Sequence, residues 1–330
     1  MQKRRVPLWL PYADSITISA DKETATFKYN GGETTESLSS LSSIMLYGES
    51  KPIHFETIDF LARKNIPIVI HRRHMAQPVW ITGGTRGDVN DLLSKQILHR
   101  HNQKKALHIV KQILRAKFRS AEWIEPIDNT MLITPKTINH LRNIEAHVAK
   151  RYWSEYFRLL GIPGHGRRTE SEVKKMLDHA SKFVSSIMLR WITYHHLSPY
   201  HGFLHTQTDY PALVYDLFEP YRPIVDRVIW NYVHTTGIEK ATVAGSVVAL
   251  KDWLDSKTYT DLTRQIVTHH ELLHGAVLSM RAYLLGETNK LLLPLPGKPN
   301  GGRPKKAGFR LYGRSAGKTD FWTEAQKYSS

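Results

Sequence analysis

The spacing of apolar and polar positions changes its period near residue 85. Before that point, short segments such as SITISA (15–20) and TATFKYN (24–30) alternate apolar and polar residues, which is typical of β-strands. We therefore expect a small β-sheet or β-sandwich domain over residues 1–84. Its other expected elements are strands at 42–48, 66–70 and 78–84, a turn at Asn30–Gly32 and a helix at 54–65.

From residue 86 the apolar positions recur with the 3.6-residue period of helices. Thr134 and Pro135 suit an N-cap and a first helical position, so a helix is expected from there to about Leu160. The fold class is therefore predicted as α+β, with a larger all-α domain over 85–330 that ends in a basic, Gly/Pro-rich tail, 294–330. Other helices are expected at 89–119, 170–195, from 223 past 233, at 242–256 and at 259–286.

Composition narrows the classes of function. The chain has no cysteine, which excludes disulfides, thiolate zinc sites and a cysteine nucleophile. No apolar run approaches the roughly 20 residues that span a bilayer. The opening MQKRRVPLWLPYADS has too short an apolar stretch for a signal peptide. We expect a cytoplasmic protein that does not enter a membrane.

The charge points to nucleic acid. Lys and Arg exceed Asp and Glu by 16, and neutralisation of DNA phosphates is the commonest use of such an excess. The segment 89–119 carries eight basic residues against one acid, Asp91. Like charges repel along a helix, so phosphates are expected nearby, although a merely solvated helix is the alternative. The candidate DNA contacts in this segment are Lys104, Lys105, Lys111 and Arg115.

One charged residue interrupts an otherwise apolar helical stripe. Glu145 lies between Leu141 and Val148 in the stretch 134–160, where an apolar residue would complete the packed face. Burial of a carboxylate is costly unless it is paired or binds a metal. The sequence leaves both options open: an ion pair with Arg or His, or a metal ligand.

Residues 201–226 contain the highest density of potentially catalytic side chains in the chain. Asp216 and Glu219 are three residues apart on one helical face, and Pro220 and Pro223 should break that helix beside them. His205, in the preceding turn, can approach either acid if the turn folds back. Several carboxylates with one imidazole suit Mg²⁺ or Mn²⁺, and phosphodiester transfer is the matching chemistry. A capping and ion-pair arrangement is the alternative.

A second motif competes with this site. His270-Glu271-Leu272-Leu273-His274 matches the H-E-x-x-H pattern of zinc peptidases. The chain contains 18 histidines, so a chance match is easy, and no suitable third ligand follows. A peptidase also explains neither the β domain nor the charge.

Four segments together resemble one known family, the CRISPR-associated integrases and endonucleases of spacer acquisition. Residues 143–153 (NIEAHVAKRYW) resemble the family's helix with a metal-binding glutamate, and 202–205 (GFLH) its glycine-to-histidine turn. Residues 213–226 (LVYDLFEPYRPIVD) resemble its helix of paired acids followed by aromatic-Arg-Pro. The helix that ends in AYLLGE (282–287) also fits, and HELLH then falls on that helix by coincidence.

The resemblance implies roles for individual residues. Glu145, His205 and Glu219 would bind Mg²⁺ or Mn²⁺, with Asp216 as a further catalytic acid and Arg222 as a DNA contact. The implied reaction is attack by the 3′-hydroxyl of a short DNA duplex on a phosphodiester at the edge of a CRISPR repeat. The implied partners are DNA, a second copy bound through the β domain, and a small ferredoxin-like CRISPR-associated subunit. A basic DNA-binding scaffold without chemistry is the competing hypothesis.

Overall fold

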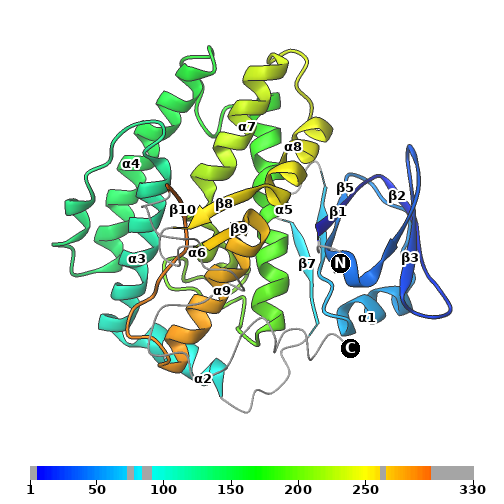
Figure 1. The fold of residues 1–330 in the computed structure, drawn as a ribbon, viewed down its shortest axis with the longest axis horizontal. Helices are drawn as coiled ribbons and strands as arrows, with labels where there is room; N and C mark the ends of the chain where they lie inside the picture. Colours follow the sequence, from blue (N-terminus) through cyan, green and yellow to red (C-terminus); the bar gives the residue numbers. More distant parts are fainter. Residues whose placement is uncertain (1–5, 73–77, 84–90, 261–264, 299–330) are drawn as a thin grey trace. The chain divides into compact units, whose positions relative to one another are not determined.

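Most strands come early along the chain and most helices follow, as the sequence predicts. The computed structural model describes residues 6–72, 78–83, 91–260 and 265–298. Within them, β1 to β7 and α1 precede α2 to α9 (Figure 1). The α+β class is confirmed. The predicted domain boundary at 84 and most of the basic tail, 299–330, lie outside the described residues.

The first part contains two sheets. In one, β1 (Val6–Pro11), β5 (Leu41–Tyr47) and β6 (Ile68–His71) are parallel, and β7 (Val79–Ile81) pairs antiparallel with β6. The other is the antiparallel set β2 (Ala13–Ile18), β3 (Thr24–Tyr29) and β4 (Gly32–Ser37). The predicted turn joins β3 to β4, where Gly31 has a φ of +119° that side chains rarely adopt.

Both sheets share one core. Phe27 of β3, Ile44 of β5 and Leu61 of α1 (Phe55–Arg63) are almost fully buried in the same cluster. The helix α1 makes the crossover that two parallel strands require. The chain divides into two compact units, and the first combines this β part with residues 181–196, the second half of α5. Within that unit, Ser186 and Ser43 form a 2.6 Å hydrogen bond between α5 and β5.

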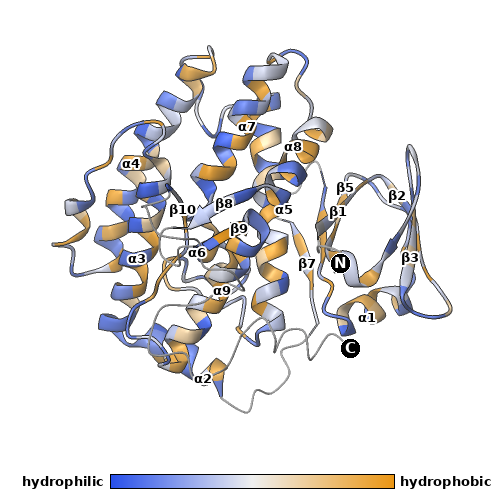
Figure 2. Cartoon of the chain, in the orientation of Figure 1, coloured by the Kyte–Doolittle hydropathy of each residue, from blue (hydrophilic) through white to orange (hydrophobic). Residues whose placement is uncertain are grey.

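The second unit comprises residues 88–180 with 197–330 and holds the remaining helices. Figure 2 shows many hydrophilic residues along α3 and α4. The described residues contain no helix that is long and apolar enough to cross a membrane. The helices of the second unit are α2 (Leu92–His101), α3 (Gln103–Ala121), α4 (Ile138–Leu159), the start of α5 (Glu172–Tyr194), α6 (Ala212–Phe218), α7 (Arg222–Thr236), α8 (Val243–Asp255) and α9 (His269–Leu285), and it has a 3₁₀ turn at Asn129–Leu132. The first unit has a 3₁₀ turn at Leu38–Ser40.

Two helix boundaries differ from the prediction, and caps explain both. The segment 89–119 is two helices, because Asn102 leaves the helical conformation and its side chain accepts the backbone N–H of Lys105 at 3.1 Å. The next helix starts three residues later than predicted: Thr137, not Thr134, is the N-cap and accepts the N–H of His140 at 3.2 Å.

The prediction of one helix over 259–286 is wrong for its first part, and the part of the chain predicted to be all-α contains a small sheet. β8 (Lys257–Thr260) and β9 (Gln265–Thr268) pair antiparallel, and β10 (Pro296–Gly297) joins them in a small sheet. Five of the eight residues of β8 and β9 are Thr, Ile or Val, and such β-branched residues favour the extended backbone. The helix α9 then begins at a capping box of Thr268 and Glu271. The Glu of the HELLH motif is therefore a capping residue.

Candidate active site

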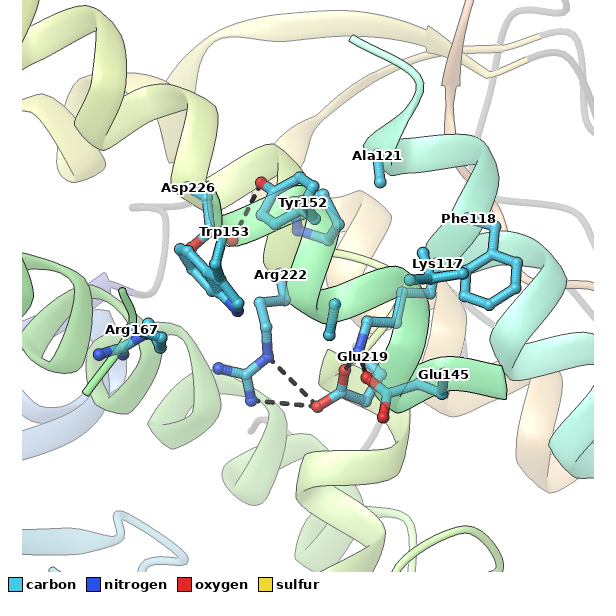
Figure 3. A pocket seen from close by; sticks show the side chains of 13 residues that line it. Lys117, Phe118, Ala121, Glu145, Tyr152, Trp153, Arg167, Glu219, Arg222 and Asp226 are labelled. Atoms are coloured by element: carbon cyan, nitrogen blue, oxygen red, sulfur yellow. Dashed lines mark hydrogen bonds and ion pairs between the residues drawn. The ribbon is translucent and has the colours of Figure 1, made fainter. Parts of the chain in front are cut away.

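A pocket of about 220 Å³ lies in the second unit, where α3, α4 and α7 meet (Figure 3). Charged side chains line one end and aromatic ones the other. Two of the predicted metal ligands, Glu145 and Glu219, are in its wall. The full lining is Lys117, Phe118, Ala121, Glu145, Val148, Ala149, Tyr152, Trp153, Arg167, Glu219, Arg222, Pro223 and Asp226.

Glu145 reaches the pocket from α4, and its side chain is 25% exposed. The ammonium of Lys117, on the neighbouring helix α3, donates a hydrogen bond to its Oε1 at 2.5 Å. Glu145 therefore has a cationic partner, which is one of the two options that the sequence left open. The partner is a lysine rather than the expected Arg or His.

Glu219 reaches the same point from the end of α6. It is the C-cap of that helix, and Pro220 follows it, so the helix stops beside the carboxylate as predicted. Its side chain is 7% exposed, with Oε2 2.5 Å from Nζ of Lys117 and Oε1 3.1 Å from Nη2 of Arg222. Burial by itself would raise the pKa of Glu219, but Arg222 and Lys117 outweigh it and hold the pKa well below its usual range.

Lys117 thus bridges two carboxylates that are far apart in the sequence (Figure 3). Burial alone would lower the pKa of this ammonium, whereas Glu219 and Glu145 raise it above its ordinary value. The lysine is charged and belongs to the site. From the sequence alone it is only one of the eight basic residues of the segment 89–119.

His205 contacts Asp216, one of the two acids that the sequence allows it to approach. Asp216 is fully buried, and its carboxylate accepts the backbone N–H groups of Phe203, Leu204 and His205 at 2.5, 2.9 and 2.9 Å. The same carboxylate contacts Nδ1 of His205 at 2.7 Å. This pairing occupies Nδ1 and leaves Nε2 as the other ring nitrogen, and a carboxylate on one ring nitrogen is the usual support of a ligand histidine. The contacts of Asp216 make it an orienting residue.

The turn that carries His205 is also fastened to α4. Arg142, one helical turn before Glu145, donates from Nε to the carbonyl of Leu204 at 2.9 Å. The turn needs a glycine, because a Cβ at Gly202 would lie 2.5 Å from the carbonyl oxygen of His205. Burial alone would lower the pKa of His205, but the hydrogen bond and charge of Asp216, with the charge of Glu219, raise it.

The donor set suits a hard divalent ion, since it offers two carboxylates and an imidazole nitrogen. In the part of the chain that the structure describes, however, no three His, Cys, Asp or Glu side chains lie close enough together to hold an ion as they stand. Between Glu145 and Glu219 the cation is Lys117. The ligand set Glu145, His205 and Glu219 therefore stays a prediction, and it is supported by the types of donor atom that these residues offer.

A third acid lies at the aromatic end of the pocket. Asp226 of α7 is 2% exposed and accepts a hydrogen bond from the hydroxyl of Tyr152 at 3.2 Å. Burial raises its pKa to about 6, against the opposing charges of Arg222 and Arg167. The guanidinium of Arg167 lies 5.3 Å from the centre of the Trp153 ring. Asp226 was not predicted as a pocket residue, although it lies only seven residues after Glu219.

Of the five predicted DNA contacts, three are exposed and two already interact with other parts of the protein. Lys104, Lys105 and Arg115 are exposed on α3, where they are free to meet phosphates. Lys111 is partly buried and donates to the carbonyl of Ile133 at 2.7 Å. Arg222 is inside the pocket, where it pairs with Glu219 and lies over the ring of Phe218. The three exposed residues fit the predicted role best.

Comparison with known proteins agrees with this fold. A model of the family described as CRISPR associated protein Cas1 matches residues 12–126 and 120–263. The chain is 31% identical over 99 residues to a CRISPR-associated endonuclease Cas1 of Pyrobaculum aerophilum, and 35% identical over 101 residues to that of Hyperthermus butylicus. Each stretch covers 30% of this chain and about a third of the relative, 34% and 30%.

Solved structures show the same fold over more of the chain. A casposase bound to integration product has a TM-score of 0.73 at 18% identity, covering 87% of this chain and 92% of its own. A Cas1 protein from Thermotoga maritima has a TM-score of 0.72 at 19% identity, covering 86% and 98%. Together the two matched ranges of the family model run from residue 12 to 263, and the chain therefore belongs to the Cas1 family of CRISPR-associated proteins.

Proposed function

We propose that the protein is a metal-dependent DNA integrase and endonuclease. In this reaction the 3′-hydroxyl of a short DNA duplex attacks a phosphodiester at the edge of a CRISPR repeat, so that one O–P bond forms as another breaks. The observation that carries the proposal is the meeting of Glu145 and Glu219 at one cation, beside the turn that presents His205. Curated relatives named as endonucleases, and the casposase bound to integration product, support the same chemistry.

Mg²⁺ or Mn²⁺ is the proposed cofactor, with Glu145, Glu219 and His205 as its ligands. When bound, such an ion activates a hydroxyl and stabilises charge on a phosphate. The remaining residues have supporting tasks. Asp216 holds the imidazole of His205 in one tautomer, and Arg142 holds the turn against α4.

The proposed partners follow from charge and from related complexes. The exposed bases Lys104, Lys105 and Arg115 would contact DNA phosphates without reading sequence, so binding should weaken steeply with salt. Similar structures include a Cas1–DNA complex and a Cas6-RT-Cas1–Cas2 complex. We propose that this chain likewise pairs with a second copy through its β part and with a small ferredoxin-like subunit, in the cytoplasm.

One observation favours a second candidate function, a DNA-binding scaffold without chemistry. Lys117 and Arg222 already neutralise Glu145 and Glu219, as in an ordinary buried ion-pair network. Such a scaffold would bind DNA with the same affinity whether or not a divalent ion is present.

The experiment that separates the two is a strand-transfer assay. Supercoiled target and a short labelled duplex are incubated with protein and Mn²⁺ or Mg²⁺, and joined product is measured. We expect product from the wild type, and its loss in Glu145→Ala and His205→Ala. Matched controls are Glu155→Ala on the same helix, where Glu155 pairs with Arg158, and His147→Ala at an exposed position; both should stay active. No product from the wild type with either ion would favour the scaffold.

A further inference from the structure

The position of Lys117 has a consequence for how a metal could enter the site. Its Nζ lies 2.5 Å from Oε1 of Glu145 and 2.5 Å from Oε2 of Glu219, and its side chain is 13% exposed. Three separate elements, α3, α4 and the end of α6, therefore converge on one ammonium group. Few lysines are buried in this way unless charged partners hold them.

Mg²⁺ binds oxygen ligands at about 2.0–2.1 Å. An ion that bridged the same two oxygens, Oε1 of Glu145 and Oε2 of Glu219, would coincide with the ammonium of Lys117. The two cations cannot occupy that position together. Either the ion displaces the lysine, or it uses only the other oxygens.

The charge of the pocket decides between these options. Glu145 and Glu219 carry two negative charges, and Lys117 and Arg222 carry two positive ones, so this group of side chains is neutral as it stands. A divalent ion added with Lys117 still in place would give the ion and these four side chains a net charge of +2 in a partly buried pocket. Such an excess is unfavourable where water is scarce. If the ammonium of Lys117 leaves as the ion enters, the net charge of the ion and the remaining side chains falls from +2 to +1.

We propose that Lys117 is a built-in counter-cation that keeps Glu145 and Glu219 together in the metal-free protein and that a divalent ion displaces on binding. The inference rests on the proposed function, since it takes both carboxylates as metal ligands. Lys117 is then an internal competitor: it stabilises the metal-free fold and weakens the apparent affinity for the ion. A lysine that remained beside the ion and only positioned its ligands would have the opposite effect on affinity.

The test measures Mn²⁺ binding directly, without DNA and without activity. Free Mn²⁺ is followed by its electron paramagnetic resonance signal in titrations of wild type, Lys117→Met and Lys117→Arg. Lys117→Met removes the charge, and we expect it to bind Mn²⁺ about tenfold more tightly or better, because no buried ion pair must be broken. Lys117→Arg keeps a cation, and it should bind no more tightly than the wild type.

Lys111→Met is the matched control. It removes a partly buried lysine from the same helix, but that lysine donates to a backbone carbonyl and contacts neither carboxylate. We expect its Mn²⁺ affinity to equal that of the wild type. If circular dichroism shows that Lys117→Met is folded, and it binds Mn²⁺ no more tightly than the wild type, the inference is overturned.

A measurement on the wild type covers the case in which Lys117→Met does not fold. Limited acetylation of lysines, mapped by mass spectrometry, should modify Lys117 slowly without metal and faster at saturating Mn²⁺, as the ammonium is released. Unchanged or slower labelling of Lys117 would contradict displacement. If neither the wild type nor Lys117→Met binds Mn²⁺ at millimolar concentration, the proposed ligand set fails instead.

Discussion

Replacement of Asp226 by Asn should stabilise the protein at pH 7 but not at pH 4. Burial raises the pKa of this carboxyl in the folded protein to about 6, from an ordinary value of 3.8. Below 3.8 the group is protonated in both the folded and the unfolded state. As the pH rises toward 6, the unfolded chain loses the proton first, so folding stability falls. The two pKa values correspond to a loss of about 3 kcal/mol of folding stability by pH 7.

Asn is uncharged over the whole range and keeps an oxygen that can accept from the hydroxyl of Tyr152. The free energy of unfolding of Asp226→Asn should therefore exceed that of the wild type by up to about 3 kcal/mol at pH 7, and the gap should close toward pH 4. Urea unfolding followed by tryptophan fluorescence at several pH values measures this difference. Asp252→Asn, at an exposed position of α8, is the matched control and should show no such trend. A gap that is constant with pH, or a more stable wild type at pH 7, would refute the reasoning.

Three further predictions concern the His205 turn and the DNA-binding face. Gly202→Ala should lower the thermal midpoint and reduce strand transfer, because its Cβ would collide with backbone, whereas Gly166→Ala, with only one atom 4.0 Å away, should not. Asp216→Asn leaves at least one buried N–H without an acceptor and should cost about 1–3 kcal/mol in thermal or urea unfolding, while the exposed Asp209→Asn should be neutral. Lys104→Glu should weaken DNA binding and reduce the slope of log affinity against log salt by about 1 or more, as measured by fluorescence anisotropy. An unchanged midpoint, an unchanged stability or an unchanged slope, respectively, would contradict these three expectations.

The elements that were predicted correctly depend on local signals. Alternation identified β2 and β3, and the two prolines after Glu219 identified the break between α6 and α7. The strands β8 and β9 were not predicted, because they adjoin a strongly helical stretch and a four-residue strand has too few positions to show a period. The start of α4 was misplaced because Thr134 and Thr137 both suit a cap, and only packing chooses between them.

The site was predicted in part for the same kind of reason. Glu145 stood out as a charge within an apolar stripe, and Asp216 was recognised through its motif. Lys117 follows the same rule, since it continues the stripe of Ala106, Val110 and Ile113 along α3. It was overlooked because the segment contains so many other bases. That it meets Glu145 and Glu219 depends on the packing of α3 against α4 and α7, which no local pattern encodes.

The most direct measurement for the central claim uses a DNA duplex with and without its 3′-hydroxyl. Wild-type protein with Mn²⁺ should join a labelled duplex with free 3′ ends to a CRISPR-repeat target, and should not join the same duplex ended in dideoxynucleotides. Glu145→Gln should join neither the duplex with free 3′ ends nor the dideoxy duplex, whereas Glu155→Gln should behave as the wild type. Joining of the dideoxy duplex, or wild-type rates from Glu145→Gln, would contradict a metal-dependent transesterification at this site.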